Sequence, residues 1–361
     1  MSRRWAIAFG ALLAAALVIA LVPRHASSPP PQRNETRAAD ENARRARAAE
    51  TPSTKPPLIF PDAGARREPH VLARAGWGSG PGDLAHKLDQ ESAPEGPMAL
   101  TVDAQGNLLV LDQLNHRIQR WTRDGRRLAP IAIGGDTAQD LTVARDGRVM
   151  LLDRLGEQNV QVLDATGRPL GDVALRGAKI PEPGGVTGLY TDDDGNAYAE
   201  REHAELVRVA DADGHASRDR PILPGRPSRG GRVFLRGAIA DRAAGTFTLR
   251  AYDAAATLVW EATIAFGGTI LYVVLLDSDA SGSVYAGARV GRESPDPPYA
   301  ITGERVELRS LDAGGAPRGA LTLDGAPAPE EIFREFTVAD DGTIYRMRRS
   351  PDGVVLEWYR L

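Results

Sequence analysis

Three groups of polar residues in this chain have types and spacings that could support chemistry. Asn115-His116-Arg117 brings an amide, an imidazole and a guanidinium together in one short segment. Asp192-Asp193-Asp194-Gly195-Asn196 offers oxygen ligands at alternating positions, which is the arrangement that Ca²⁺ needs. Glu200, Glu202 and His203 follow closely and could supply ligands to a divalent metal ion.

Each group also has a structural interpretation, and the sequence favours it. The glycine of the acidic segment is misplaced for an EF-hand, and Ala197-Tyr198-Ala199 continues as a strand, so an acidic hairpin turn is the better interpretation. No two histidines have the H-x-x-x-H or H-x-H spacing of metal ligands. The chain contains no phosphate-cradling glycine motif, no nucleophile elbow and no cysteine. The sequence therefore predicts no catalytic, cofactor-binding or metal-ligating residue, and no cofactor.

The elements that would position these residues are short strands joined by tight turns, seen best from Pro97 to Leu128. Ala99–Val102, Leu108–Leu111 and Arg117–Thr122 have the apolar or alternating patterns of strands. Ala104-Gln105-Gly106-Asn107 and Asp124-Gly125 supply the turns between them. Three strands in about 30 residues leave no room for a crossover helix, so they form an antiparallel meander.

Weaker copies of this unit recur along the chain, each marked by a glycine in its first turn. These glycines are Gly106, Gly147, Gly195, Gly245, Gly282 and Gly342. Their spacing scatters around the 40 to 50 residues typical of a four-stranded propeller blade. Six copies predict an all-β, six-bladed β-propeller over residues 57–361. The fourth blade fits least well, because Thr246–Ala265 lacks an Asp-x-x-Gly turn.

The best copy resembles an NHL repeat, a propeller repeat named for its Asn-His-Leu signature. The matching residues are Gly106-Asn107, Leu109–Asp112, Asn115-His116-Arg117-Ile118 and Asp124-Gly125. Arg117 stands where the signature has leucine. The resemblance implies a six-bladed NHL-like propeller in which Asn115-His116-Arg117 lies in a loop between two strands and satisfies backbone polar groups.

The two ends of the array can complete one another. The last copy supplies only three strands and ends with Val354–Leu361. Leu58-Ile59-Phe60 and Val71-Leu72-Ala73 are spare strand material near the start, and pairing one of them with Val354–Leu361 would hide both open edges. Two Gly- and Pro-rich inserts, Gly80–Pro97 and Arg289–Glu304, are expected to form loops on a rim.

The first 23 residues have the pattern of a membrane anchor or signal segment. Arg3 and Arg4 precede Trp5–Val22, an uninterrupted run of eighteen apolar or small residues that would span about 27 Å as a helix. This length favours an uncleaved single-pass transmembrane helix, with the rest of the chain on the extracytoplasmic side of the cell membrane. The alternative is cleavage at Ala26-Ser27-Ser28, which would give a secreted or periplasmic protein.

Residues 24–56 are predicted to be a disordered linker rich in Pro, Ala and Arg. Residues 1–56 hold nine Lys or Arg against four Asp or Glu, so the remainder of a chain with net charge −4 carries −9. This acidic balance argues against nucleic acid as a partner, despite arginine clusters around Arg123, Arg226 and Arg346. The absence of cysteine excludes disulfides and a lipidated N-terminal cysteine.

These observations favour a monomeric, membrane-tethered binding or scaffold module over an enzyme. Its partner would be a protein or a cell-envelope polymer held by rim loops. The alternative is a metal-dependent propeller hydrolase or lyase, similar to lactonases or amidating lyases, with its site at the central channel. The enzyme requires four or more carboxylate, Asn or His groups from separate blades to converge there, whereas Ala, Val, Leu and Arg at the channel would favour the scaffold.

Overall fold

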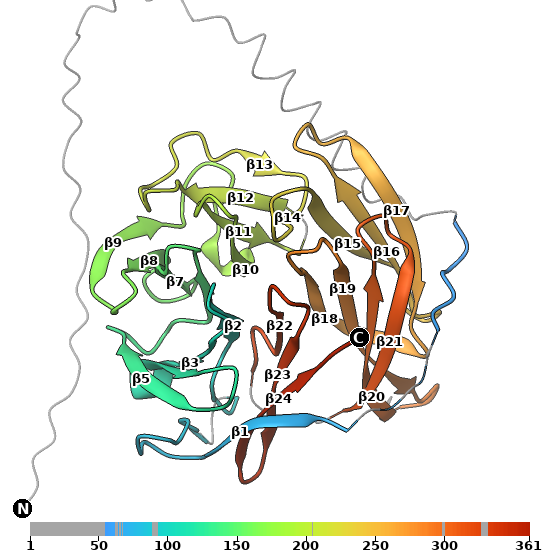
Figure 1. Ribbon diagram of the computed structural model, residues 1–361, viewed down its shortest axis with the longest axis horizontal. Coiled ribbons are helices and arrows are strands. Elements are labelled where there is room, and N and C mark those ends of the chain that lie inside the picture. Colours follow the sequence, from blue (N-terminus) through green and yellow to red (C-terminus); the bar gives the residue numbers. More distant parts are fainter. Residues whose placement is uncertain are drawn as a thin grey trace, which may run out of the picture. The chain divides into compact units, whose positions relative to one another are not determined.

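The computed structural model describes residues 55–61, 64, 66, 68–88, 93–203, 205–297, 300–325 and 331–361. These residues form six antiparallel sheets of four strands, placed around an axis as the blades of a propeller (Figure 1). The six-bladed prediction is confirmed. We call the strands of a blade A to D from the axis outward.

Blades one to three follow one another in the chain with complete sets of strands. Blade one consists of β2 (Leu100–Val102), β3 (Leu108–Asp112), β4 (Arg117–Trp121) and β5 (Arg127–Ala132). Blade two consists of β6 (Asp140–Val143), β7 (Val149–Asp153), β8 (Asn159–Leu163) and β9 (Pro169–Ala174). Blade three consists of β10 (Val186–Thr191), β11 (Ala197–Arg201), β12 (Glu205–Ala210) and β13 (Ile222–Leu223).

Blades four to six complete the ring. Blade four consists of β14 (Arg226–Pro227), β15 (Phe234–Asp241), β16 (Thr246–Tyr252) and β17 (Leu258–Ala265). Blade five consists of β18 (Thr269–Ser278), β19 (Val284–Glu293), β20 (Ile301–Leu311) and β21 (Pro317–Asp324). Blade six consists of β22 (Phe336–Val338), β23 (Ile344–Ser350), β24 (Gly353–Tyr359) and, from the start of the propeller, β1 (His70–Gly76).

Strand β1 closes the ring as the sequence predicts. It pairs with β24 from His70 opposite Trp358 to Gly76 opposite Gly353, so the outer edge of the C-terminal strand is covered (Figure 1). Of the two segments considered for this role, the one containing Val71–Ala73 is used. Leu58 instead lies along β17, where its amide donates to the carbonyl oxygen of Thr263.

The two ends of the propeller differ in character because the strands alternate in direction. One end carries the A–B and C–D turns, and we call it the turn end. In eleven of these turns the amide of the fourth residue donates to the carbonyl of the first, and the fourth residue has a positive φ. That residue is glycine in ten turns and Ala256, at φ 60°, in the eleventh. The opposite end, the connection end, carries the B–C turns and the connections between blades.

Apolar side chains fill the interfaces between blades, and five such clusters are present among the described residues. Phe247, Leu249 and Ala251 of blade four, for example, pack against blade five. Both faces of most strands are therefore buried, which accounts for the continuous apolar runs at Leu108–Leu111 and Val149–Leu152.

Two expectations need correction. Gly245 is not the A–B turn glycine of blade four, because it lies in the B–C turn; Ser228-Arg229-Gly230-Gly231 forms the A–B turn. Residues 289–304 are not simply a loop, since β19 extends to Glu293 and β20 begins at Ile301. Residues 289–293 and 301–304 therefore form a hairpin that lengthens blade five at the connection end.

The expected membrane segment (residues 1–23) and all but the last two residues of the expected linker (24–56) lie outside the described residues. Within the described part of the chain, no helix is long and apolar enough to cross a membrane.

Candidate functional site at the axis of the ring

The six innermost strands carry a varied set of side chains at one equivalent position, two residues before each A–B turn. This set is Thr101, Thr142, Tyr190, Arg226, Asp277 and Thr337. Three threonines are joined here by one tyrosine, one arginine and one aspartate. The set matches neither the ligand-rich channel expected of an enzyme nor the Ala, Val, Leu and Arg lining expected of a scaffold.

Around Tyr190 and Arg226 lies a cluster of five residues from separate parts of the ring, which we call the axial cluster. It consists of Asp140, Tyr190, Glu200, Arg226 and Arg334. Arg226 of blade four donates to Glu200 of blade three twice, from Nε to Oε1 at 2.8 Å and from Nη2 to Oε2 at 3.0 Å. Its Nη1 donates to the carbonyl oxygen of Leu276 in blade five at 3.0 Å. One side chain thus joins three consecutive blades.

Arg334, in the connection that leads to blade six, makes the second ion pair of the cluster. Its Nε and Nη2 donate to the two carboxylate oxygens of Asp140 at 3.0 and 2.5 Å. Nη2 also donates to the carbonyl oxygen of Leu189 at 2.7 Å. Asp140 further accepts the backbone amide of Leu189, so Arg334 and Asp140 together hold blades two and three.

Tyr190 lies between the two arginines. The guanidinium carbons of Arg226 and Arg334 are 4.7 and 4.9 Å from the centre of its ring, within the range of cation–π attraction. A Cβ atom at Gly188 would lie 2.7 Å from a ring carbon and 2.9 Å from the hydroxyl of Tyr190, so a side chain there would have to displace the ring. Burial raises the pKa of Tyr190, and the phenol is therefore neutral at physiological pH.

Glu200 is buried, and it is ionised because of its partners. Burial by itself would raise its pKa, but the guanidinium of Arg226 and the hydrogen bonds to Glu200 lower the pKa to about 2. Thr187 Oγ1 lies 3.2 Å from Glu200 Oε2, and His203 Nδ1 lies 3.7 Å from the same oxygen. Both oxygens of this carboxylate accept hydrogen bonds from Arg226, so Glu200 cannot ligate a metal ion without losing them.

Glu202 and His203 form the B–C turn above this carboxylate. Both have positive φ values, 51° and 56°, an uncommon conformation for residues with side chains. The amide of His203 donates to Thr187 Oγ1 at 3.0 Å, which holds the turn in place. The imidazole of His203 is 76% exposed, so it could contact a ligand at the connection end. Glu200, Glu202 and His203 do not converge on a common metal position.

The Asn115-His116-Arg117 triplet lies in the B–C turn of blade one and at the start of β4, and it is not part of the axial cluster. Asn115 Nδ2 donates to the carbonyl oxygen of Gly78 at 2.9 Å, and Arg117 Nε donates to Asp112 at 2.7 Å. Arg117 Nη2 donates to the carbonyl oxygens of Gly80 and Asp83. These contacts fasten the segment that follows β1 to blade one.

The acidic segment at Asp192 forms the A–B turn of blade three. One carboxylate oxygen of Asp192 accepts the amide of Asn196, and the other accepts Asn196 Nδ2 and the hydroxyl of Tyr198. A different group, Asp211, Asp213 and His215, brings three ligand atoms within 4.8 Å of one another on an outer turn. The H-x-H and H-x-x-x-H patterns did not find this group, because its D-x-D-x-H spacing contains a single histidine.

Most of the arginines that cluster in the sequence form ion pairs or hydrogen bonds within the propeller. Arg346 is buried and pairs with Glu335 at 2.8 Å, and Glu335 also accepts Arg289. Arg348 pairs with Glu357, and Arg123 with Asp341. These pairs link strands and blades to one another.

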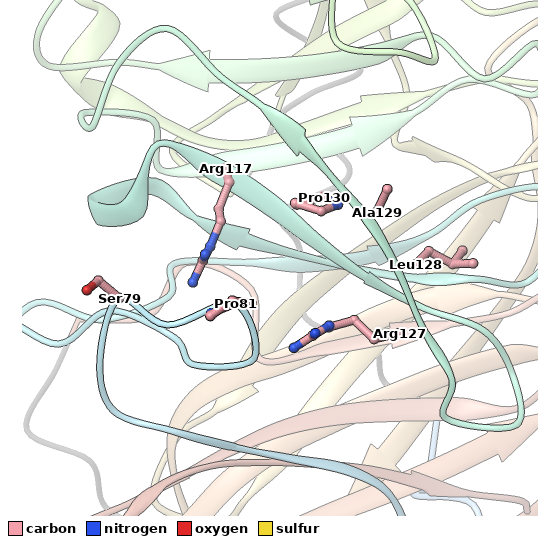
Figure 2. A pocket seen from close by; sticks show the side chains of 7 residues that line it. All are labelled: Ser79, Pro81, Arg117, Arg127, Leu128, Ala129 and Pro130. Atoms are coloured by element: carbon pink, nitrogen blue, oxygen red, sulfur yellow. The ribbon is translucent and has the colours of Figure 1, made fainter.

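A shallow hollow of about 430 Å³ lies beside β5 of blade one (Figure 2). It is lined by Ser79, Pro81, Arg117, Arg127, Leu128, Ala129 and Pro130. Figure 2 shows the side chains of Arg117 and Arg127 extending toward the loop that carries Ser79 and Pro81. Arg117 is already bonded to that loop, as described above.

No protein-family model matches the chain, and a search of curated proteins returns no significant match. Among solved structures, Kuenenia stuttgartiensis hydrazine synthase is similar at 14% identity and a TM-score of 0.47, over 72% of this chain and 76% of that one. A DUF4221 family member from Bacteroides vulgatus is similar at 10% identity and a TM-score of 0.47, over 81% and 98%. Virginiamycin B lyase from Staphylococcus aureus is similar at 10% identity and a TM-score of 0.38, over 74% and 95%.

Proposed function

We propose that this chain is a binding or scaffold module: an NHL-like propeller, tethered through residues 1–23 and facing the extracytoplasmic side. It binds a protein or an envelope polymer through its connection end. The proposal rests on the contrast between the two ends of the ring. The turn end is built from short, nearly identical turns whose Asp side chains cap their own backbone amides, as Asp164 and Asp211 do.

The connection end carries the irregular segments of the propeller. The segment after β1 and the long β19–β20 hairpin both project there. Apolar side chains are exposed at this end of the ring. Leu88 on the segment after β1 is 71% exposed, Ile301 on the hairpin is 46% exposed, and Leu155 on the B–C turn of blade two is 60% exposed. Apolar side chains exposed on variable loops over a rigid scaffold are typical of a protein-binding surface.

A photocrosslinking amino acid in the full-length chain in its own membrane tests this assignment. It is placed at Leu155 or Ile301 on the connection end, and at Ala165 or Ala254 on the turn end as matched controls. The proposal expects one discrete crosslinked species from the connection-end positions and none from the controls. Equal crosslinking from both ends, or crosslinking only from the turn end, contradicts it.

The metal-dependent hydrolase or lyase is the competing prediction. The carboxylates of the axial cluster, Asp140 and Glu200, would have to leave their arginine partners to ligate an ion. Metal analysis of the purified chain separates the two functions, since the enzyme requires a stoichiometric divalent ion and the scaffold does not.

The location is tested by protease accessibility in intact and permeabilised cells. An extracytoplasmic propeller is cleaved when the cytoplasm is still sealed. Protection until the cytoplasmic membrane is broken contradicts this part of the proposal.

A further inference from the structure

The interface between blades three and four, which we call the seam, differs from the other five. The apolar clusters of the described residues lie between blades one and two, two and three, four and five, five and six, and six and one. None of them spans the seam. Since burial of apolar surface is the main force that holds blades together, the seam is expected to be the weakest interface of the ring.

The side chains that face the seam explain why it lacks an apolar core. Alternate residues of β16 pack against blade five, so the intervening Thr246, Thr248, Arg250 and Tyr252 face blade three. The hydroxyls of Thr248 and of its cross-strand neighbour Thr263 are buried and have no hydrogen-bond partner. These side chains are only 2% and 5% exposed, so their polar atoms are desolvated without compensation.

Blade three presents a mixed face to the seam: Leu206, the cross-strand neighbour of Glu200, is apolar and buried there but belongs to none of the five apolar clusters. Ala197 and Ala199 of β11 pack against blade two, which leaves Tyr198 and Glu200 on the side of blade four. The hydroxyl of Tyr198 donates within its own blade, to Asp192. Glu200 accepts from Arg226 across the seam.

The strands that border the connection across the seam are also the shortest in the ring. β13, the last strand of blade three, contains two residues, and β14, the first strand of blade four, contains two. The innermost strands of the other blades contain three to ten. Pairing over so few residues opens at low cost, and such segments form the low-stability part of a native structure.

We infer that the ring opens between blades three and four, and that the Glu200–Arg226 ion pair is the latch that holds this seam closed. Arg226 also bonds to Leu276 of blade five and stacks on Tyr190 of blade three, so it spans the opening at the axis. The other interfaces keep their apolar cores and move as units. Opening of the seam then converts the closed ring into an arc of six blades, with blades three and four at its two ends.

The turn end offers matched positions for a test, and the chain has no native cysteine. Ala165, Ala212 and Ala254 are the exposed second residues of the C–D turns in blades two, three and four. Spin labels at Ala212 and Ala254 of the full chain report on the seam, and labels at Ala165 and Ala212 report on an interface with an apolar core. Double electron–electron resonance is expected to give a distance distribution about twofold wider across the seam than across the control interface.

The latch is tested in the same labelled chains. Arg226→Gln is expected to widen the distribution of the seam pair further and to leave the control pair unchanged. Arg289→Gln removes an ion pair with Glu335 beside an apolar core and serves as the matched control, with no effect on the seam. Equal widths for the two labelled pairs, or a seam distribution that Arg226→Gln does not change, overturns the inference.

A stabilising variant covers the case in which Arg226→Gln fails to fold. Thr248→Val with Thr263→Val replaces the unbonded hydroxyls by methyl groups of similar shape. It is expected to narrow the seam distribution to that of the control pair and to slow amide exchange in β13 and β14 by about tenfold. Unchanged exchange in these strands contradicts the inference.

Discussion

Acid is expected to weaken the propeller through Glu200, and the size of the effect follows from its surroundings. The pKa of Glu200 falls from an ordinary value of 4.5 to about 2 in the folded protein. At 1.36 kcal/mol per pKa unit, this difference corresponds to about 3 kcal/mol of folding free energy. Because the folded pKa is the lower one, the contribution is fully present above the unfolded value and is lost as the pH falls toward the folded value.

The perturbation that isolates this contribution is Glu200→Gln. It removes the carboxylate while Arg226 stays buried, and breaking a buried pair in this way is expected to cost about 3 kcal/mol or somewhat more near neutral pH. The groups that face Glu200 are Arg226, His203, Thr187 and the phenol of Tyr190.

Urea unfolding followed by tryptophan fluorescence over a series of pH values measures the difference between wild type and variant. It should be constant above about pH 6 and shrink by about 3 kcal/mol toward pH 2. Glu205→Gln is the matched control: it removes a half-buried, partly solvated pair with Arg201 and should change stability by less than about 1 kcal/mol throughout. A difference for Glu200→Gln that is independent of pH would refute the assignment of an ionised, arginine-bound carboxylate.

Four further outcomes follow from the structure. Ala256→Gly should stabilise the chain by up to about 1 kcal/mol in the same urea assay, because φ is 60° there; Ala254→Gly in the same turn should destabilise it. Gly188→Ala should cost about 1–3 kcal/mol, since the new Cβ collides with Tyr190, and a smaller loss would mean that the ring moves freely. Removal of residues 1–76 takes away β1 and exposes the edge of β24, so light scattering should show concentration-dependent association; a stable monomer would contradict the closure. Calcium or chelator should shift the melting temperature by less than about 1 °C, because the Asp192 carboxylate is occupied by Asn196 and Tyr198; a larger calcium-specific rise would indicate a calcium site at Asp192 or at the group of Asp211, Asp213 and His215.

The number of blades was predictable because the turns within a blade have a recognisable local sequence. A short turn that contains Asp and ends in glycine is tight whatever surrounds it, as at Gly106 and Gly282. The sequence of blade four departs from this pattern at two of its turns. Its A–B turn, Ser228–Gly231, contains no Asp, and its C–D turn places Ala256 where other blades have glycine. The sequence pattern therefore points to Gly245, which lies in the B–C turn.

The axial cluster was not predictable by motif. Arg334 and Asp140 are 194 residues apart, and Arg226 and Glu200 are 26 apart. The sequence contained one usable signal, which is the position two residues before each A–B turn. Three blades have threonine there, and the departures to Tyr190, Arg226 and Asp277 mark where the axis differs from a plain repeat.

The sequence by itself determined the local features of this protein: its strands, its turns, its six repeats and the spare strand that closes the ring. These features depend on residues near one another in the chain. They also depend on the alternation of side chains along a strand, which gives each strand two distinct faces. Only the tertiary structure decided which blade covers each face, and therefore which interface lacks an apolar core. It also decided which arginine meets which carboxylate, because ion pairs form between side chains that only the closed ring brings within hydrogen-bonding distance.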